Sequence, residues 1–136
     1  MKPFVIWIAI TLFVFGAISG AYHLYLQNNS RKILVALDSS FSMKSVWNQV
    51  PDILKDLEKR RYTMFSLLTE KNKIHGWSPS LNLDTLVPYA PRNFSKLLDS
   101  ASYPEINEAK EKFLITNREG AQSENMAGWT VVQLSP

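Results

Sequence analysis

Residues 31–44 have the sequence RKILVALDSSFSMK and carry the strongest structural signal in the chain. The segment contains an apolar run, residues 33–37, without alternating polar residues, which is typical of a strand covered on both faces in a parallel sheet. Asp38 ends the run, and a serine-rich loop leads into a segment with helical spacing. An acidic loop rich in hydroxyl groups is therefore expected at the carboxyl end of a buried strand, where open α/β sheets bind ligands.

Asp38, Ser40 and Ser42 form the pattern Asp-x-Ser-x-Ser. One carboxylate and two hydroxyls on alternate residues can direct their oxygens to one point, which suits a hard cation such as Mg²⁺. In this pattern and its position after an apolar strand, the chain resembles the von Willebrand factor A family, which carries a metal-ion-dependent adhesion site here. The alternative interpretation is a serine loop whose hydroxyls cap the next helix.

The resemblance implies further metal ligands, and the chain departs from the family at both places. Where the family has Thr-Asp-Gly after a later strand, this chain has Thr116, Asn117 and Arg118, so Asn117 offers an oxygen without charge. Thr85 is the candidate for the threonine ligand, although its neighbours do not match the family. With one carboxylate instead of two, Mg²⁺ binding is expected to be weak.

Residues 4–26 contain no charged side chain and are mostly apolar. A segment of this length is long enough to span a bilayer as a helix. Gly16 and Gly20 form a small-residue pair, which is typical of close packing on another membrane helix. The alternative is that glycine and alanine are simply common in such segments. A cleaved signal peptide is the alternative, since Lys2 and an apolar core fit that pattern too. We expect an uncleaved single-pass anchor at residues 1–26, a short tether at 27–32, and a domain at 33–136 on the outer, periplasmic side.

The remaining patterns predict an α/β domain, namely a truncated Rossmann-like sheet of the von Willebrand factor A type, mostly parallel and flanked by helices. Helices are expected at residues 44–61, 93–100 and 104–112, strands at 62–69, 74–77, 112–118 and 129–134, and loops at 78–92 and 120–128. Such a sheet is short for the family and leaves an edge or face for a partner to cover.

The composition of the chain excludes some classes of function. The chain of 136 residues has no cysteine and a net charge of +3 without a dense basic tract, so a thiol nucleophile is excluded and nucleic acid is not an expected partner. No catalytic motif or small-molecule site is evident, and His75 lacks an evident acidic or nucleophilic partner. We therefore expect a non-catalytic protein-binding subunit of a larger membrane complex; the alternatives are a Mg²⁺-dependent adhesion protein and an assembly or maturation factor for a membrane enzyme.

Overall fold

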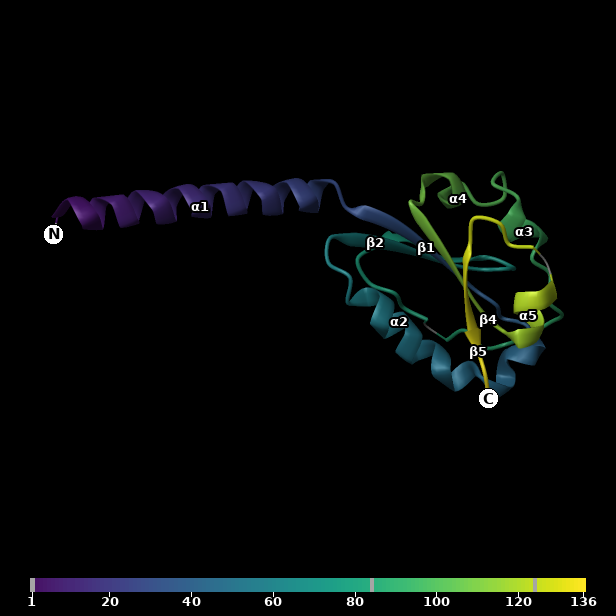
Figure 1. The fold of residues 1–136 in the computed structure, drawn as a ribbon. Helices are drawn as coiled ribbons and strands as arrows, with labels where there is room; N and C mark the ends of the chain where they lie inside the picture. The colour runs from purple at the N-terminus through teal and green to yellow at the C-terminus, as the bar shows by residue number, and fades with distance from the viewer. Residues whose placement is uncertain (1, 84, 124) are drawn as a thin grey trace. The chain divides into compact units, whose positions relative to one another are not determined.

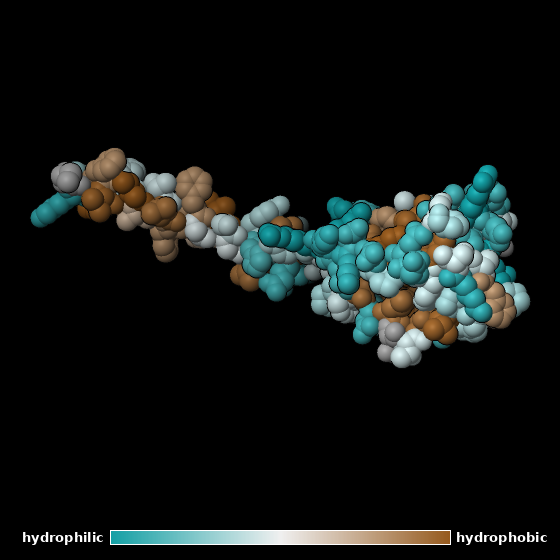
Figure 2. All heavy atoms as spheres, turned by 90° about the horizontal axis from the view of Figure 1, so that it is seen from below, coloured by the Kyte–Doolittle hydropathy of each residue, from teal (hydrophilic) through white to brown (hydrophobic). Residues whose placement is uncertain are grey.

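The computed structural model of the protein describes residues 2–83, 85–123 and 125–136. The chain divides into two compact units, Met1–Ser30 and Arg31–Pro136. The first unit is a single helix, α1 (Lys2–Asn28), and no described residue of it is buried. Figure 2 shows hydrophobic side chains along α1. The helix is long and apolar enough to cross a membrane, a test that a signal sequence near the N-terminus also passes.

The second unit is built on a five-stranded sheet in the order β3-β2-β1-β4-β5 (Figure 1). The strands are β1 (Arg31–Leu37), β2 (Thr63–Thr69), β3 (Lys73–Ser78), β4 (Glu111–Asn117) and β5 (Thr130–Leu134). Strands β1, β2, β4 and β5 run parallel, whereas β3 is antiparallel to β2. The α/β class predicted from the sequence is confirmed, with a mixed sheet. Because α1 ends at Asn28 and β1 begins at Arg31, the linking segment is shorter than the expected tether at residues 27–32.

Strand β1 lies at the centre of the sheet and is buried on both faces. Ile33, Val35 and Leu37 belong to one core cluster, which also contains side chains of α2. Leu34 and Ala36 belong to the other cluster, which contains side chains of α3 and α4. All five side chains are fully buried, which explains why the sequence of this strand is apolar without alternation.

The helices are shorter than the sequence predicts. Two 3₁₀ turns, η1 (Phe41–Ser45) and η2 (Trp47–Gln49), precede α2 (Val50–Glu58), so the expected helix at residues 44–61 begins later and ends earlier. Pro51 lies in the first turn of α2, where its missing N–H costs no intrahelical hydrogen bond.

Helices α3 (Ser95–Leu98) and α4 (Glu105–Glu108) pack on the other face of the sheet. Both helices are short. The expected helix at 104–112 stops at Glu108, since the residues from Glu111 onwards pair with β1 as strand β4.

The segment expected to be a loop at residues 120–128 is partly helical, and that prediction was wrong for its first part. Helix α5 (Arg118–Ser123) begins directly after β4. The side-chain oxygen of Asn117 accepts a hydrogen bond from the Gly120 amide at 2.9 Å, which caps the helix in the way an N-terminal asparagine does. The cap starts the helix where composition alone indicates a small, polar loop.

Candidate functional site

The residues of the Asp-x-Ser-x-Ser pattern lie at the carboxyl ends of the parallel strands. Asp38 directly follows β1, and its amide donates to the Ile115 carbonyl of β4 at 2.9 Å. Asn117 ends β4, and Glu70 follows β2. The sheet extends from β1 to β2 on one side and to β4 on the other, and a reversal of this kind is where open α/β sheets bind ligands.

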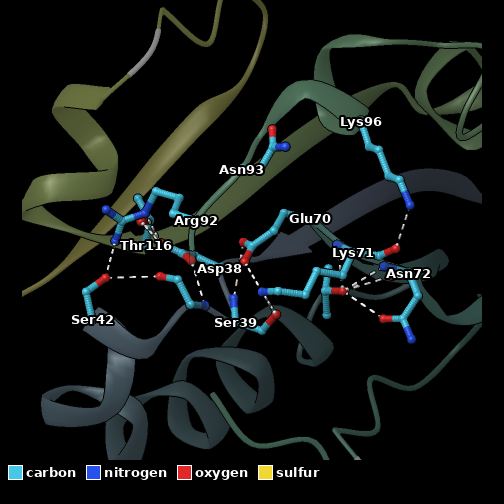
Figure 3. A network of polar contacts seen from close by, with 12 residues as sticks. Asp38, Ser39, Ser42, Glu70, Lys71, Asn72, Arg92, Asn93, Lys96 and Thr116 are labelled. Carbon is cyan, nitrogen blue, oxygen red and sulfur yellow. Dashed lines mark hydrogen bonds and ion pairs between the residues drawn. The ribbon is translucent and has the colours of Figure 1, made fainter. Parts of the chain in front are cut away.

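The Asp38 carboxylate is fully buried and accepts several hydrogen bonds, among them those from Arg92 and Thr116 (Figure 3). Its Oδ1 accepts from the Ser40 amide at 3.0 Å, while its Oδ2 accepts from Thr116 Oγ1 at 2.7 Å and from Arg92 Nε at 2.8 Å. Burial opposes ionisation, but the hydrogen bonds from Thr116, Ser40 and Arg92 outweigh it and hold the pKa of Asp38 below its ordinary value. Asp38 is therefore a carboxylate anion at neutral pH.

Arg92 reaches this carboxylate from the loop between β3 and α3. Its Nη2 donates to Ser42 Oγ at 2.5 Å and to Asn117 Oδ1 at 2.8 Å, in addition to the bond from Nε to Asp38. The Arg92 side chain is only 16% exposed. The guanidinium thus lies among oxygens of three residues that the sequence analysis named as possible metal ligands.

The other candidate ligands are placed differently. Ser40 Oγ lies 3.0 Å from Ser42 Oγ, so Ser40 belongs to the same cluster. Asn117 also fixes the loop, since its Nδ2 donates to the Ser42 carbonyl at 3.0 Å. Thr85 instead lines an open hollow of about 410 Å³ together with Lys73, Leu86, Val87 and Tyr89. The structure therefore brings together four of the five candidates.

A second polar cluster adjoins Asp38 and centres on Glu70, which is 2% exposed. Glu70 accepts a hydrogen bond from the Ser39 amide at 3.3 Å and is paired with the Lys71 ammonium. Lys71 Nζ also lies 3.0 Å from Ser39 Oγ and 4.6 Å from the centroid of the Tyr89 ring. Burial raises the pKa of Glu70 to about 7; Lys71 opposes this rise and the nearby Asp38 carboxylate adds to it.

The contact between Ser39 and Lys71 places a hydroxyl beside an amine, as in some nucleophilic catalysts. Ser39 is fully buried, however, and the Lys71 ammonium is paired with Glu70. This arrangement orders the loop after β1, because it satisfies buried polar atoms. His75 is similarly engaged with backbone, since its Nδ1 lies 2.8 Å from the Gly76 carbonyl oxygen.

The geometry at Asp38 does not fit a divalent ion as the side chains stand. A metal needs converging oxygens with free lone pairs and a surplus of negative charge. Here Asp38 Oδ2 already accepts two hydrogen bonds, and Arg92 donates to the oxygens of Ser42 and Asn117. Because arginine stays protonated at all ordinary pH values, its charge balances the one carboxylate of the motif.

Sequence reasoning missed three residues of the site: Arg92, Thr116 as a hydrogen-bond donor, and Glu70. The sequence does contain a signal for Arg92, which is the only lysine or arginine between Lys73 and Lys96 and lies in a proline-rich loop. A single strong base in an otherwise nearly neutral loop is a candidate partner for a buried acid.

Comparisons of the chain with models of protein families, with curated proteins and with solved structures find no match. The interpretation of the site therefore depends on the motif, the sheet and the contacts described above.

Proposed function

We propose that the protein is a membrane-anchored protein-binding domain of the von Willebrand factor A type, which serves as a non-catalytic accessory subunit of a larger membrane complex. The observation that carries this proposal is the edge of the sheet at β5, beside which the described part of the chain places no further strand. Strand β5 ends the sheet beside β4, and its sequence TVVQL contains no charge and no proline. Unpaired backbone groups on such an edge are a template for a strand from another chain.

The two edges of the sheet differ in a way that supports β5 as the binding edge. At the opposite edge, the pairing of β3 with β2 contains register shifts, and β3 begins with Lys73. Irregular pairing and lysine are devices that protect an edge from association. At β5, Val131 is 36% exposed and Val132 is only partly buried against the core on the α2 side. A partner strand would cover both valines.

The family type is supported by where the sheet places the motif. Asp38, Ser40 and Ser42 follow the central strand, and Thr116 and Asn117 end the neighbouring strand β4. These are the positions that the resemblance to von Willebrand factor A domains implies for the ligand-facing loops. Protein binding rather than catalysis is the activity that this resemblance suggests.

Helix α1 supports membrane attachment, and we propose that the domain lies on the outer, periplasmic side. The helix spans 27 residues, which corresponds to about 40 Å at a rise of 1.5 Å per residue, longer than the bilayer core of about 30 Å. A Cβ atom added at Gly16 or Gly20 would meet nothing within 4 Å among the described residues. This small-residue stripe is therefore accessible to a second membrane helix.

The experiment is affinity purification of the tagged full-length chain from its native membranes in mild detergent, followed by quantitative mass spectrometry. Val131→Lys places a charge on the β5 edge and is expected to reduce the co-purified partner about tenfold or more, because the lysine must be desolvated in the new strand pair. Val87→Lys is the matched control, since Val87 is 62% exposed and lies outside the sheet. Loss with Val87→Lys and retention with Val131→Lys would contradict the proposal.

Two further arms separate the alternatives. Addition of a chelator is expected to leave the partner bound, whereas a metal-dependent adhesion protein would release it. Replacing Gly16 and Gly20 together by leucine tests the membrane helix independently of β5, since the change lies in the other compact unit. An assembly or maturation factor would associate with partners that are incompletely assembled and would be missing from the finished complex.

A further inference from the structure

Three side-chain oxygens converge on one cation of the protein itself. Asp38 Oδ2, Ser42 Oγ and Asn117 Oδ1 each accept a hydrogen bond from the Arg92 guanidinium, at 2.8, 2.5 and 2.8 Å. Two of these residues follow β1 and the third ends β4, so the guanidinium joins the carboxyl ends of two neighbouring strands. The planar fork of arginine suits such bridging, because its N–H groups point in fixed directions.

The charges at this point balance without a second cation. Asp38 contributes one negative charge, and Arg92 contributes one positive charge while only 16% exposed. The exposed Glu119 carboxylate is more distant, at 4.0 Å from Arg92 Nη1. A divalent ion placed among the same oxygens would meet the positive guanidinium at close range in a poorly hydrated site, where repulsion is weakly screened.

We propose that Arg92 is the built-in cation of this site, which takes the place of the divalent ion that the oxygens of Asp38, Ser42 and Asn117 would otherwise hold. The site is thus closed to metal by one side chain and keeps its loop geometry without any ion. This inference concerns the residues of the site alone and stands or falls independently of the proposed accessory function.

If Arg92 stands in for a metal ion, its removal has an effect that a merely degenerate loop would not show. Removal of the guanidinium would leave the Asp38 carboxylate, the hydroxyls of Ser40 and Ser42, and the Asn117 amide oxygen around the vacated space. These are hard oxygen ligands of the kind that Mg²⁺ and Mn²⁺ prefer. The loops themselves would still be joined by the bond from Asn117 Nδ2 to the Ser42 carbonyl. Arg92 therefore conceals a latent metal site.

The test measures Mn²⁺ and Mg²⁺ binding to the full-length chain in detergent micelles, by calorimetry and by the thermal unfolding midpoint with and without metal. The variants are Arg92→Ala and, as the matched control, Arg118→Ala, which removes a nearby exposed arginine of α5. We expect Arg92→Ala to bind Mn²⁺ about tenfold or more tightly than the wild type, because one repelling charge has been removed. Arg118→Ala is expected to behave like the wild type.

Two additional variants make the result specific. Adding Asp38→Asn to Arg92→Ala is expected to abolish the gained Mn²⁺ affinity, since the carboxylate is lost. Adding Asn117→Asp instead is expected to strengthen it further, because a second carboxylate joins the site. A folded Arg92→Ala protein whose Mn²⁺ affinity equals that of the wild type would overturn the proposal.

If Arg92→Ala does not fold, Arg92→Gln takes its place, since glutamine keeps a polar group in the loop without the charge. If neither variant folds, the unfolding midpoint of the wild-type protein with and without metal tests the proposal. An unfolding midpoint that is unchanged by millimolar Mn²⁺ and by a chelator would support the built-in cation. A midpoint that rises with Mn²⁺, together with saturable binding, would overturn it.

Discussion

Arg92 Nε lies 2.8 Å from Asp38 Oδ2, although 54 positions separate the two residues in the chain. The aspartate is fully buried and the arginine side chain is largely buried. Thr116 donates to the same carboxylate oxygen at 2.7 Å, so the anion is satisfied from two directions. A buried pair of this kind contributes little net stability over an apolar core, but breaking it is costly because one charge is left unpaired.

Substitution of Asp38 by alanine is therefore expected to lower the free energy of unfolding by about 3 kcal/mol, because the Arg92 charge then lacks a buried partner. The measurement is chemical denaturation of the full-length chain in micelles. The double variant Asp38→Ala/Arg92→Ala is expected to lose clearly less than the sum of the two single changes. Additive losses would contradict direct coupling between the two side chains.

The control for this cycle is Asp56→Ala. Asp56 pairs with Lys59 at 2.8 Å, but both side chains are more than two thirds exposed. Exposed pairs of this kind contribute only about 0–1 kcal/mol, so the change is expected to leave the unfolding curve nearly unchanged.

Gly120 is predicted to tolerate no side chain. A Cβ atom at this position would lie 1.8 Å from Thr116 Oγ1 and 3.0 Å from Asp38 Oδ2, so the Thr116 hydroxyl would have to leave the carboxylate. Gly120→Ala is expected to lower the free energy of unfolding by about 2–3 kcal/mol through this overpacking. Gly76→Ala is the matched control, because nothing lies within 4 Å of its added Cβ among the described residues. Equal stability of the two variants would contradict the packing of α5 on the site.

The raised pKa of Glu70 predicts a pH dependence of stability. The folded protein holds the Glu70 proton up to about pH 7, whereas the unfolded chain releases it near the ordinary glutamate pKa of 4.5. The folded state therefore binds more protons between these values, and the free energy of unfolding is expected to fall as pH rises from about 4.5 to about 7. The groups that act on this carboxyl are Lys71, Asp38 and Ser39.

Denaturation of Glu70→Gln at several pH values checks this dependence. Between about pH 5 and 7, the free energy of unfolding of the variant is expected to change much less with pH than that of the wild type. Asp38 acts in the opposite direction at lower pH, because its pKa is lower in the folded protein than the ordinary value of 3.8. The stability that it contributes is present above pH 3.8 and is lost as the pH falls through the pKa of Asp38 in the folded protein. Glu119→Gln is the exposed control and is expected to keep the wild-type slope.

Helix α1 predicts integral membrane attachment. Phe13 lies near the middle of α1 and is 78% exposed in its unit. Phe13→Lys places a charge at the centre of the span and is expected to cost about 3 kcal/mol of insertion free energy. Alkaline extraction of membranes would then release more of the variant than of the wild type. The N-terminal mass of the purified protein distinguishes an anchor from a cleaved signal sequence.

The parts of the fold that follow from local sequence patterns were predictable. The apolar run before Asp38 marks the central strand because both of its faces are covered, and this fact is visible in composition alone. Strand β3 and the last strand, β5, were found within one residue of their expected ends. Helix ends were less accurate, because Pro51 and the cap formed by Asn117 act through single backbone groups.

The site was only partly predictable for a different reason. Asp38, Ser40 and Ser42 are close in sequence, and a motif can describe them. Arg92 reaches Asp38 across 54 positions from an irregular loop, where no periodicity describes the direction of a side chain. Thr116 lies in β4, but its contact with Asp38 spans 78 positions and depends on how the two strands pair. The sequence therefore indicated the oxygens but not the cation among them.

Whether Arg92 holds the cation position can be measured by paramagnetic broadening with Mn²⁺ in the NMR spectrum of the ¹⁵N-labelled full-length chain in micelles. Mn²⁺ bound among the motif's oxygens would broaden the amide signals of Ser40, Ser42 and Gly120 before all others. If Arg92 holds the cation position, these three signals keep their intensity in the wild type and are lost selectively in Arg92→Ala. Selective loss of the same signals in the wild type would contradict Arg92 as the cation of the site.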